Sequence, residues 1–259
     1  MIDRQDFRIL QLNGGRVVWQ RPYPENTIHF ELPPMEHGYG DAQIDDYGLV
    51  QNGRKNYPWQ RGVQMQLRAR FSHGLDELQG TAGFGFWNAP FGDPTVKYPA
   101  LPQTVWFFFG SPPNNLPLAM QGKGNGWFAS TLDATTRQAK WLLPLAPLVL
   151  LGNQNGRIRD KIWPNVRERL GISFAPLAMD MTVWHDYRLQ WQDEGCSFWV
   201  DGRLILQTSH SPQGPLGFVC WLDNQYMIVT NRGRLGWGIL PLPETQWMEI
   251  ADLRIDQDF

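Results

Sequence analysis

The chain has 259 residues with 23 basic and 25 acidic side chains, and the net charge of −2 leaves no basic excess to neutralise nucleic-acid phosphates. We therefore expect no nucleic-acid partner. Hydrophobic residues make up 42% and aromatic residues 13% of the chain, which is enough to fill a large core and excludes intrinsic disorder. The 26 glycines and 20 prolines, beside few charges, favour an all-β sandwich or barrel in a single domain.

Period-two alternation of apolar and polar residues predicts β-strands over most of the chain. The strands predicted before residue 131 are 7–12, 16–19, 27–32, 63–71, 81–88 and 104–110. Residues 104–110 are apolar at almost every position, as in a central strand that is covered on both faces. Residues 33–62 are rich in Pro, Gly, Asp and Asn with little pattern, so we expect a long loop there.

Residues 131–182 break the alternation and predict a helical insertion. Residues 134–143 can form a helix that Pro144 ends. Apolar residues then recur every four positions from Ile158 to Leu170, opposite a row of basic residues, with Pro164 dividing or kinking this second helix. Strands return after residue 182. No repeat or linker marks a boundary, so we expect one domain, 1–259, that contains the insertion 131–182.

The N-terminus starts with charged residues and has no apolar stretch typical of a secretory signal. We therefore expect a cytoplasmic protein, with secretion open if a preceding segment has been removed. The longest apolar run, residues 141–151, is interrupted by two prolines and is too short to cross a bilayer, so we expect no membrane partner. Cys196 and Cys220 form no CxxC motif and no His/Cys cluster occurs, so we expect no metal and no cofactor. Two buried thiols are the expected state, with a disulfide as the alternative.

The segment 184–202, Trp-His-Asp-Tyr-Arg-Leu-Gln-Trp-Gln-Asp-Glu-Gly-Cys-Ser-Phe-Trp-Val-Asp-Gly, is the most specific in the chain. Its first strand is followed by a Glu-Gly turn and by a strand that ends in Asp-Gly, which suits a hairpin. This segment resembles the concanavalin A-like lectin/glucanase superfamily, in particular the laminarinase-like glucanases of glycoside hydrolase family 16. Their corresponding strands carry a similar His-x-Tyr-x-aliphatic-x-Trp stretch followed by Val-Asp-Gly. The resemblance extends over most of the chain and implies an all-β, two-sheet antiparallel jelly-roll sandwich, here with a short helical insertion.

The chain departs from these glucanases where their catalysis takes place. They carry Glu-x-Asp-x-x-Glu on one strand, which supplies the nucleophile and the acid/base of a retaining mechanism. Where the order along the chain would place that strand, residues 104–116 read Thr-Val-Trp-Phe-Phe-Phe-Gly-Ser-Pro-Pro-Asn-Asn-Leu, with aromatic residues in place of carboxylates. We therefore exclude a retaining glucanase of this type and leave open whether another reaction is catalysed.

An aromatic concave cleft is the first candidate site. Gly83 and Gly85 lack side chains on the strand face that shows Trp87, so a ligand could approach closely there, and Trp106 and Phe108 would extend the aromatic floor. The alternative is that these aromatic side chains pack beneath the helical insertion. The predicted ligand-binding residues are Trp87, Asn88, Trp106, Phe108, Asn114, Trp221 and Asn224.

Asp223 and His37 are the two candidates for catalytic residues. Asp223 shares a strand face with Trp221 and could act as a general base or bind hydroxyl groups, although an ordinary Asp-Asn turn is the alternative. His37 lies in a loop with several acids, so acid–base chemistry or a calcium site is open there, as is simple loop polarity. We expect His185 to be a core histidine between the sheets.

Three functions follow from these observations. The first is recognition of a saccharide or glycoside-like ligand in the aromatic cleft, without two-carboxylate hydrolysis. The second is an intracellular cyclase, isomerase or hydrolase that acts on an apolar small molecule enclosed by the cleft and the helices. The third is a structural or partner-binding module. The oligomeric state stays open.

Overall fold

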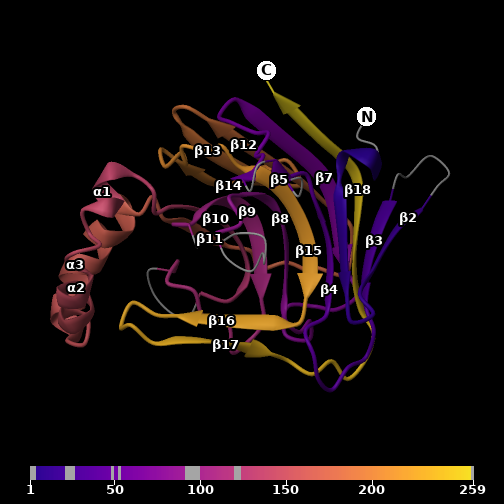
Figure 1. The fold of residues 1–259 in the computed structure, drawn as a ribbon, viewed down its shortest axis with the longest axis horizontal. Helices are drawn as coiled ribbons and strands as arrows, with labels where there is room; N and C mark the ends of the chain where they lie inside the picture. The colour runs from indigo at the N-terminus through magenta and orange to yellow at the C-terminus, as the bar shows by residue number, and fades with distance from the viewer. Residues whose placement is uncertain are drawn as a thin grey trace.

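The computed structural model describes residues 4–20, 27–47, 50–51, 54–90, 100–119 and 124–257. Two seven-stranded sheets pack against each other, and the helices lie to one side of them (Figure 1). Sheet A contains, in spatial order, β1 (Arg8–Leu12), β4 (Asp41–Asp45), β15 (Gly217–Asp223), β8 (Thr81–Trp87), β9 (Gln103–Gly110), β10 (Gly126–Asp133) and β11 (Ser173–Pro176). Sheet B contains β14 (Arg203–Thr208), β13 (Gly195–Val200), β12 (His185–Gln192), β7 (Val63–Phe71), β18 (Gln246–Gln257), β3 (Thr27–Leu32) and β2 (Arg16–Gln20). All pairings within both sheets are antiparallel, so the predicted two-sheet jelly-roll sandwich is confirmed.

The core between the sheets is built from alternate residues of each strand. In β7, every second residue from Val63 to Phe71 is buried and the residues between them are partly exposed, as the alternation predicts. All eight residues of β9 are buried, because its second face is covered as well. Both cysteines are buried and free, which confirms the expectation of two thiols.

The segment that carries the family resemblance forms two antiparallel strands, β12 and β13, and β14 follows them at the edge of sheet B. Strands β12 and β13 pair from Tyr187–Val200 to Gln192–Gly195, and β13 then pairs with β14. Asp201 and Gly202 join β13 to β14 with φ values of 50° and 74°. Two consecutive positive φ values are typical of the tight hairpin turn that Asp-Gly favours.

The expectation of one long loop over residues 33–62 is wrong, because β4 lies within it. Ala42 and Ile44 point into the core and Asp41, Gln43 and Asp45 point to the other face of sheet A. Aspartate is depleted in strands and two apolar residues are too few for a recognisable alternation. The strand forms because it pairs with β1 on one side and β15 on the other.

The helices occupy a shorter part of the insertion than predicted. They are α1 (Arg137–Lys140), α2 (Ala146–Gly152) and α3 (Gly156–Arg169), and they lie between β10 and β11 in sequence. Pro164 lies inside α3 and does not divide it. Side-chain oxygens cap two of the helices, since Thr136 Oγ1 accepts from Ala139 N and Asn155 Oδ1 accepts from Arg157 N.

The smaller elements are the 3-10 helix η1 (Arg4–Asp6), the pair β5 (Val50–Gln51) and β6 (Arg54–Lys55), and the hairpin β16 (Gln225–Val229) and β17 (Leu235–Ile239). The β16–β17 hairpin follows directly after β15 and runs towards the helices (Figure 1). Its first strand is bridged to Asn115, whose N–H donates to Met227 O and whose carbonyl accepts from Val229 N.

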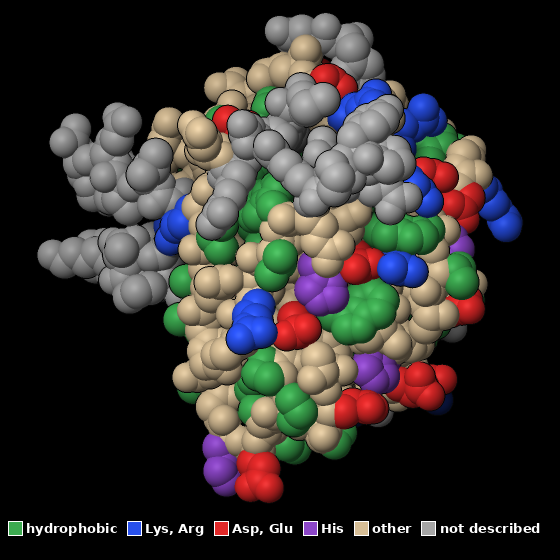
Figure 2. All heavy atoms as spheres, turned by 90° about the vertical axis from the view of Figure 1, so that its right-hand side faces the viewer, with side chains coloured by type: hydrophobic (Ala, Val, Ile, Leu, Met, Phe, Trp, Pro, Cys, Tyr) green, Lys and Arg blue, Asp and Glu red, His purple; other side chains and the backbone are tan. Residues whose placement is uncertain are grey.

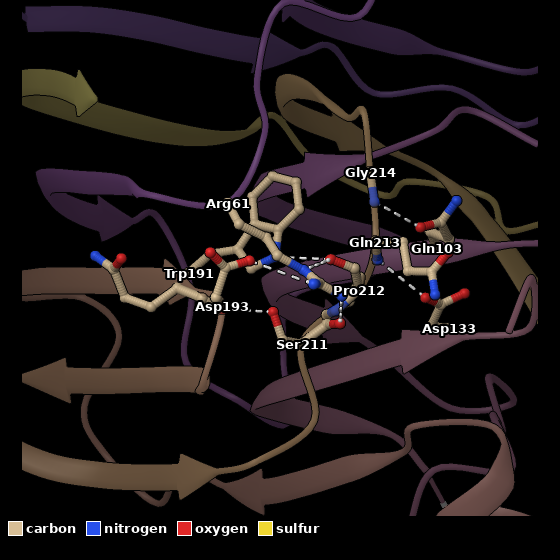
Figure 3. Close-up of polar contacts among 10 residues, drawn as sticks. Arg61, Gln103, Asp133, Trp191, Asp193, Ser211, Pro212, Gln213 and Gly214 are labelled. Carbon is tan, nitrogen blue, oxygen red and sulfur yellow. Dashed lines mark hydrogen bonds and ion pairs between the residues drawn. The ribbon is translucent and has the colours of Figure 1, made fainter. Parts of the chain in front are cut away.

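The loop from β14 to β15 carries the chain from sheet B to sheet A and is fixed from both sheets (Figure 3). From the sheet B side, Arg61 Nε and Trp191 Nε1 both donate to Pro212 O, at 3.1 and 2.9 Å. From the sheet A side, Asp133 Oδ2 accepts from Gln213 N at 3.0 Å and Gln103 Oε1 accepts from Gly214 N at 2.9 Å. Buried Asp133 and Gln103 therefore satisfy backbone groups of this crossing segment.

Candidate functional site

The outer face of sheet A, which is turned away from sheet B, carries a group of large aromatic side chains. Trp87, Trp106 and Trp221 come from β8, β9 and β15, and we call them the tryptophan cluster. Their ring centroids are 5.9 Å apart for Trp87–Trp106, 6.5 Å for Trp87–Trp221 and 5.5 Å for Trp106–Trp221. Phe108 adjoins the cluster, 5.1 Å from Trp106. The structure thus brings together Trp87, Trp106 and Phe108, which were predicted to form an aromatic floor, and adds Trp221, which was predicted to bind ligand beside Asp223.

Each indole N–H of the cluster is already hydrogen-bonded within the chain. Trp87 Nε1 donates to Tyr47 Oη at 2.6 Å and Trp106 Nε1 donates to Ser130 Oγ at 3.0 Å. Trp221 Nε1 donates to Thr81 Oγ1 at 2.9 Å. These bonds fix the orientation of the rings, so the part that remains for a ligand is the ring face and edge.

The glycines of β8 serve the cluster itself. A Cβ atom on Gly83 would lie 2.8 Å from the Trp221 ring, and one on Gly85 would lie 2.6 Å from the backbone of Trp106. The expectation of a strip free of side chains beside Trp87 is therefore wrong, because the Trp221 ring covers Gly83. The glycines allow the aromatic rings to lie flat on the sheet.

Trp87 is the accessible member of the group. Trp106, Phe108 and Trp221 are at most 9% exposed, whereas Trp87 is only partly buried. The Trp87 ring is nearly parallel to that of Trp221, with an interplanar angle of 11°. A flat ligand that reaches this face therefore meets Trp87 first.

Three buried polar atoms on or beside this face have no hydrogen-bond partner among the described residues: Thr104 Oγ1, Asn114 Nδ2 and Asp41 Oδ1. Thr104 lies directly opposite Trp87 in the β8–β9 pairing. Asn114 Nδ2 lies against Gly110, 2.2 Å from where a Cβ atom would be. Buried polar atoms without a partner are rare in native proteins, and an ordered water, an ion or a functional role can account for them.

The predicted asparagines are mostly occupied in holding the fold. Asn88 Oδ1 accepts from Gln103 N at 2.9 Å and its Nδ2 donates to Leu101 O. Asn224 is fully buried and bonds Gly40 N, Gly38 O and Leu240 O through its amide. Asn114 Oδ1 accepts from Met227 N, which leaves only its Nδ2 unpaired.

The two catalytic candidates come from segments that the fold places side by side. The carboxylate of Asp223 is buried and accepts hydrogen bonds from Thr81 Oγ1 at 2.7 Å, Gln225 Nε2 at 2.6 Å and Tyr39 Oη at 3.3 Å. Burial raises its pKa to about 6, although these bonds counteract part of the effect. His37 lies in the same loop as Tyr39 and is exposed.

Sequence reasoning missed Asp41, which lies directly opposite Asp223 in the β4–β15 pairing. Burial and the neighbouring Asp223 raise the pKa of Asp41 well above its usual value. The two carboxyl groups are at most 2% exposed, so they form a buried acidic pair at the end of the tryptophan face. With only two apolar residues in β4, the sequence held no signal that could have placed Asp41 there.

His185 lies at the start of β12 and its ring is partly exposed. Its Nδ1 is 2.6 Å from Asp201 Oδ2 and its Nε2 is 2.8 Å from Asp180 O. The expectation of a histidine inside the core is therefore wrong, because the first position of the strand reaches the edge of the sandwich. Among the residues that the structure describes, no group of three or more His, Cys, Asp or Glu side chains could hold a metal ion.

The chain is similar in fold to several solved structures of carbohydrate-related proteins. Over 97% of its length it matches 59% of a GlcNAcα1-4Gal-releasing endo-β-galactosidase from Clostridium perfringens, with 12% identity and a TM-score of 0.46. Over 98% of its length it matches 79% of a Crh5 transglycosylase in complex with NAG, with 10% identity and a TM-score of 0.49. Over 88% of its length it matches 77% of a β-glucanase from Bacillus licheniformis, with 11% identity and a TM-score of 0.41.

The chain therefore spans less than two thirds of the length of the endo-β-galactosidase. At these identities and TM-scores, the likenesses do not say what this chain binds or catalyses. No protein-family model matches the sequence, and no curated protein matches it either.

Proposed function

We propose that the chain binds a saccharide on the outer face of sheet A, with the ring of Trp87 as the contact surface. The observation that carries this proposal is the tryptophan cluster. The indoles of Trp106 and Trp221 are buried, and the accessible ring of Trp87 lies nearly parallel to that of Trp221. A rigid aromatic surface buries the apolar CH face of a sugar ring at little cost in side-chain entropy.

The polar neighbours of the cluster support a saccharide over a purely apolar ligand. Thr104 Oγ1 lies on the strand opposite Trp87, and Asn114 Nδ2 lies beyond Phe108 on the same face; both lack a partner. A sugar offers hydroxyl groups that both accept and donate, so it can pair with a hydroxyl and with an amide N–H. An apolar ligand would leave both groups unpaired, which costs free energy at a buried position.

An apolar small molecule is the second candidate, and the apolar side chains around the tryptophan cluster favour it. Val219, Phe128, Leu118 and Ile172 pack on the same outer face and form an apolar cluster with the tryptophans. The two candidate ligands differ in their hydrogen bonds, because only a saccharide would pair with the unpaired polar atoms of Thr104 and Asn114.

The test is a binding titration on purified protein with neutral oligosaccharides, followed by intrinsic tryptophan fluorescence and calorimetry. Trp87→Ala should abolish the binding, whereas Trp87→Phe should retain most of it because a ring face remains. Trp199→Ala is the matched control, since Trp199 is a partly exposed tryptophan on sheet B that packs against Arg188. Thr104→Val should weaken binding of a saccharide and leave binding of an apolar probe unchanged.

Saccharide binding that survives Trp87→Ala in a protein with an unchanged circular dichroism spectrum would refute the proposal. Binding that responds equally to the Trp87 and the Trp199 substitution would also refute it. Tight binding of flat apolar probes alone, insensitive to Thr104→Val, would establish the second candidate instead.

A further inference from the structure

A second surface exposes large apolar side chains around α2. None of the seven residues of α2, Ala-Pro-Leu-Val-Leu-Leu-Gly, is buried. A helix that is apolar on all sides is normally enclosed by protein or by lipid. Leu148 and Leu151 of this helix are 66% and 70% exposed, and Trp141 just before it is 65% exposed.

The β16–β17 hairpin extends this surface. In β17, Leu235 and Trp237 alternate with glycines, so their two side chains point to the same face of the hairpin. They are 76% and 79% exposed. The hairpin turn is fastened to the end of α2, because Asn153 Nδ2 donates to Asn231 O at 2.6 Å and Gln154 Nε2 donates to Arg232 O at 2.8 Å. Figure 1 shows the tip of the hairpin reaching the lower end of the helices. We call the exposed apolar residues of this region the apolar rim: Trp141, Leu143, Leu145, Leu148, Leu151, Leu235 and Trp237.

The described part of the face opposite the helices does not gather apolar residues in this way (Figure 2). On the far side of the molecule, hydrophobic side chains are interspersed with basic, acidic and histidine side chains (Figure 2). There, on sheet B, the ring of Trp247 packs against Arg70 and against His29. Large exposed apolar side chains gathered in one region mark interaction sites in soluble proteins.

The elements that carry the apolar rim are strongly basic. Residues 137–169 and 230–234 together hold nine Lys or Arg and two Asp or Glu, a net charge of +7 in a chain whose net charge is −2. Both acids already have partners, since Asp160 pairs with Arg159 and Glu168 pairs with His210. The remainder of the molecule is correspondingly acidic, so the charge is concentrated beside the apolar surface.

We propose that the apolar rim docks on the surface of an anionic phospholipid bilayer. Leucine side chains enter the boundary between headgroups and acyl chains, tryptophans lie at that boundary, and the exposed Lys and Arg side chains contact the anionic headgroups. A second copy of the chain fits less well, because a contact between two rims would bring two regions of charge +7 together. α2 has seven residues, so the contact is an interfacial one.

Among the described residues, no helix is long and apolar enough to cross a membrane.

The test is flotation of the full chain with vesicles of phosphatidylcholine alone and of phosphatidylcholine mixed with phosphatidylserine. Wild-type protein should float with the mixed vesicles, less so at high salt, and should bind pure phosphatidylcholine weakly. The double variant Leu148→Asp, Leu151→Asp should lower binding to the mixed vesicles by at least about tenfold, because charges replace the side chains that enter the bilayer.

The matched control is Val18→Asp, Leu204→Asp, which makes the same chemical change at two exposed apolar positions of sheet B. This control should bind vesicles as the wild type does, and circular dichroism checks the fold of both variants. Equal flotation of the two double variants would overturn the proposal, as would absence of flotation with the mixed vesicles. A wild type that is dimeric by light scattering, becomes monomeric with the rim variant and ignores vesicles would overturn it in favour of self-association.

Discussion

Asp46 should make the stability of this protein fall as the pH rises towards neutrality. Burial raises the pKa of its carboxyl from 3.8 to about 7, although hydrogen bonds from Trp59 Nε1 and Phe218 N to its two oxygens oppose this effect. The folded state therefore holds this proton where the unfolded chain releases it. A carboxyl with a raised folded pKa contributes its stability fully below the unfolded pKa and loses it as the pH rises through the folded pKa.

The magnitude follows from the two pKa values. One pKa unit corresponds to about 1.4 kcal/mol, so the whole difference for Asp46 is about 4 kcal/mol between pH values below 3.8 and those above 7. Between about pH 5 and pH 8, roughly 2.5 kcal/mol of this free energy of unfolding should be lost. Asp41 and Asp223 have raised pKa values as well and add to the loss in the same direction.

Asp46→Asn isolates the contribution of one carboxyl. The side chain of the variant cannot ionise. Its NH2 group, however, faces one of the two donors whose hydrogen bonds the carboxylate accepted, and this lowers the free energy of unfolding by about 1–3 kcal/mol at every pH. Urea unfolding of both proteins at several pH values between about pH 5 and pH 8 separates the two effects, because the constant cost cancels when slopes are compared. As the pH rises over this range, the free energy of unfolding of Asp46→Asn should increase by about 2.5 kcal/mol relative to that of the wild type. Parallel curves for the two proteins would refute the reasoning.

Three further outcomes are expected. Trp191→Ala should lower the free energy of unfolding by about 3–5 kcal/mol in urea titrations, because a fully buried ring and its bond to Pro212 are removed; a loss below about 1 kcal/mol would contradict the packing described for the core. Cys196 and Cys220 should not react with a thiol reagent in the native protein, since both are buried and burial raises the pKa of each thiol; rapid native-state labelling would contradict this. Hydrolysis of β-1,3 and mixed-linkage glucans should be undetectable in a reducing-end assay, because the Glu-x-Asp-x-x-Glu spacing is missing; release of reducing ends that a single acid substitution abolishes would disprove it.

Alternation predicted the strands wherever enough apolar residues repeat. β7 and β9 are within one residue of their predicted bounds, since five or more apolar positions mark each of them. β4 escaped prediction because its aspartates face the outer side of sheet A, where partners that are distant in sequence compensate for poor strand propensity. Arg8, for example, pairs with Asp45 from the neighbouring strand at 2.8 Å.

The candidate site could be predicted in its residue types but not in their roles. Strand parity put Trp87 on the face of β8 that carries Gly83 and Gly85, and Trp106 was expected to extend that face. Trp221 was predicted separately, beside Asp223, and it is the structure that gathers the three indoles on one face. The asparagines could not be assigned from the sequence, because their partners, such as Gly40 for Asn224, are distant along the chain. The sequence pattern likewise excluded a membrane-spanning segment at residues 141–151 but did not show that this segment stays at the surface, which is what motivates a lipid contact.

The most direct test of the central claim reads the tryptophans themselves during saccharide binding. The chain contains 13 tryptophans, and labelling with 5-fluorotryptophan gives each of them its own ¹⁹F resonance, with that of Trp87 assigned by its disappearance in Trp87→Phe. Titration with the bound oligosaccharide should shift the Trp87 resonance most and leave that of Trp199 on sheet B in place. Shifts confined to tryptophans of sheet B, with the Trp87 resonance unmoved, would contradict the assignment of the binding face.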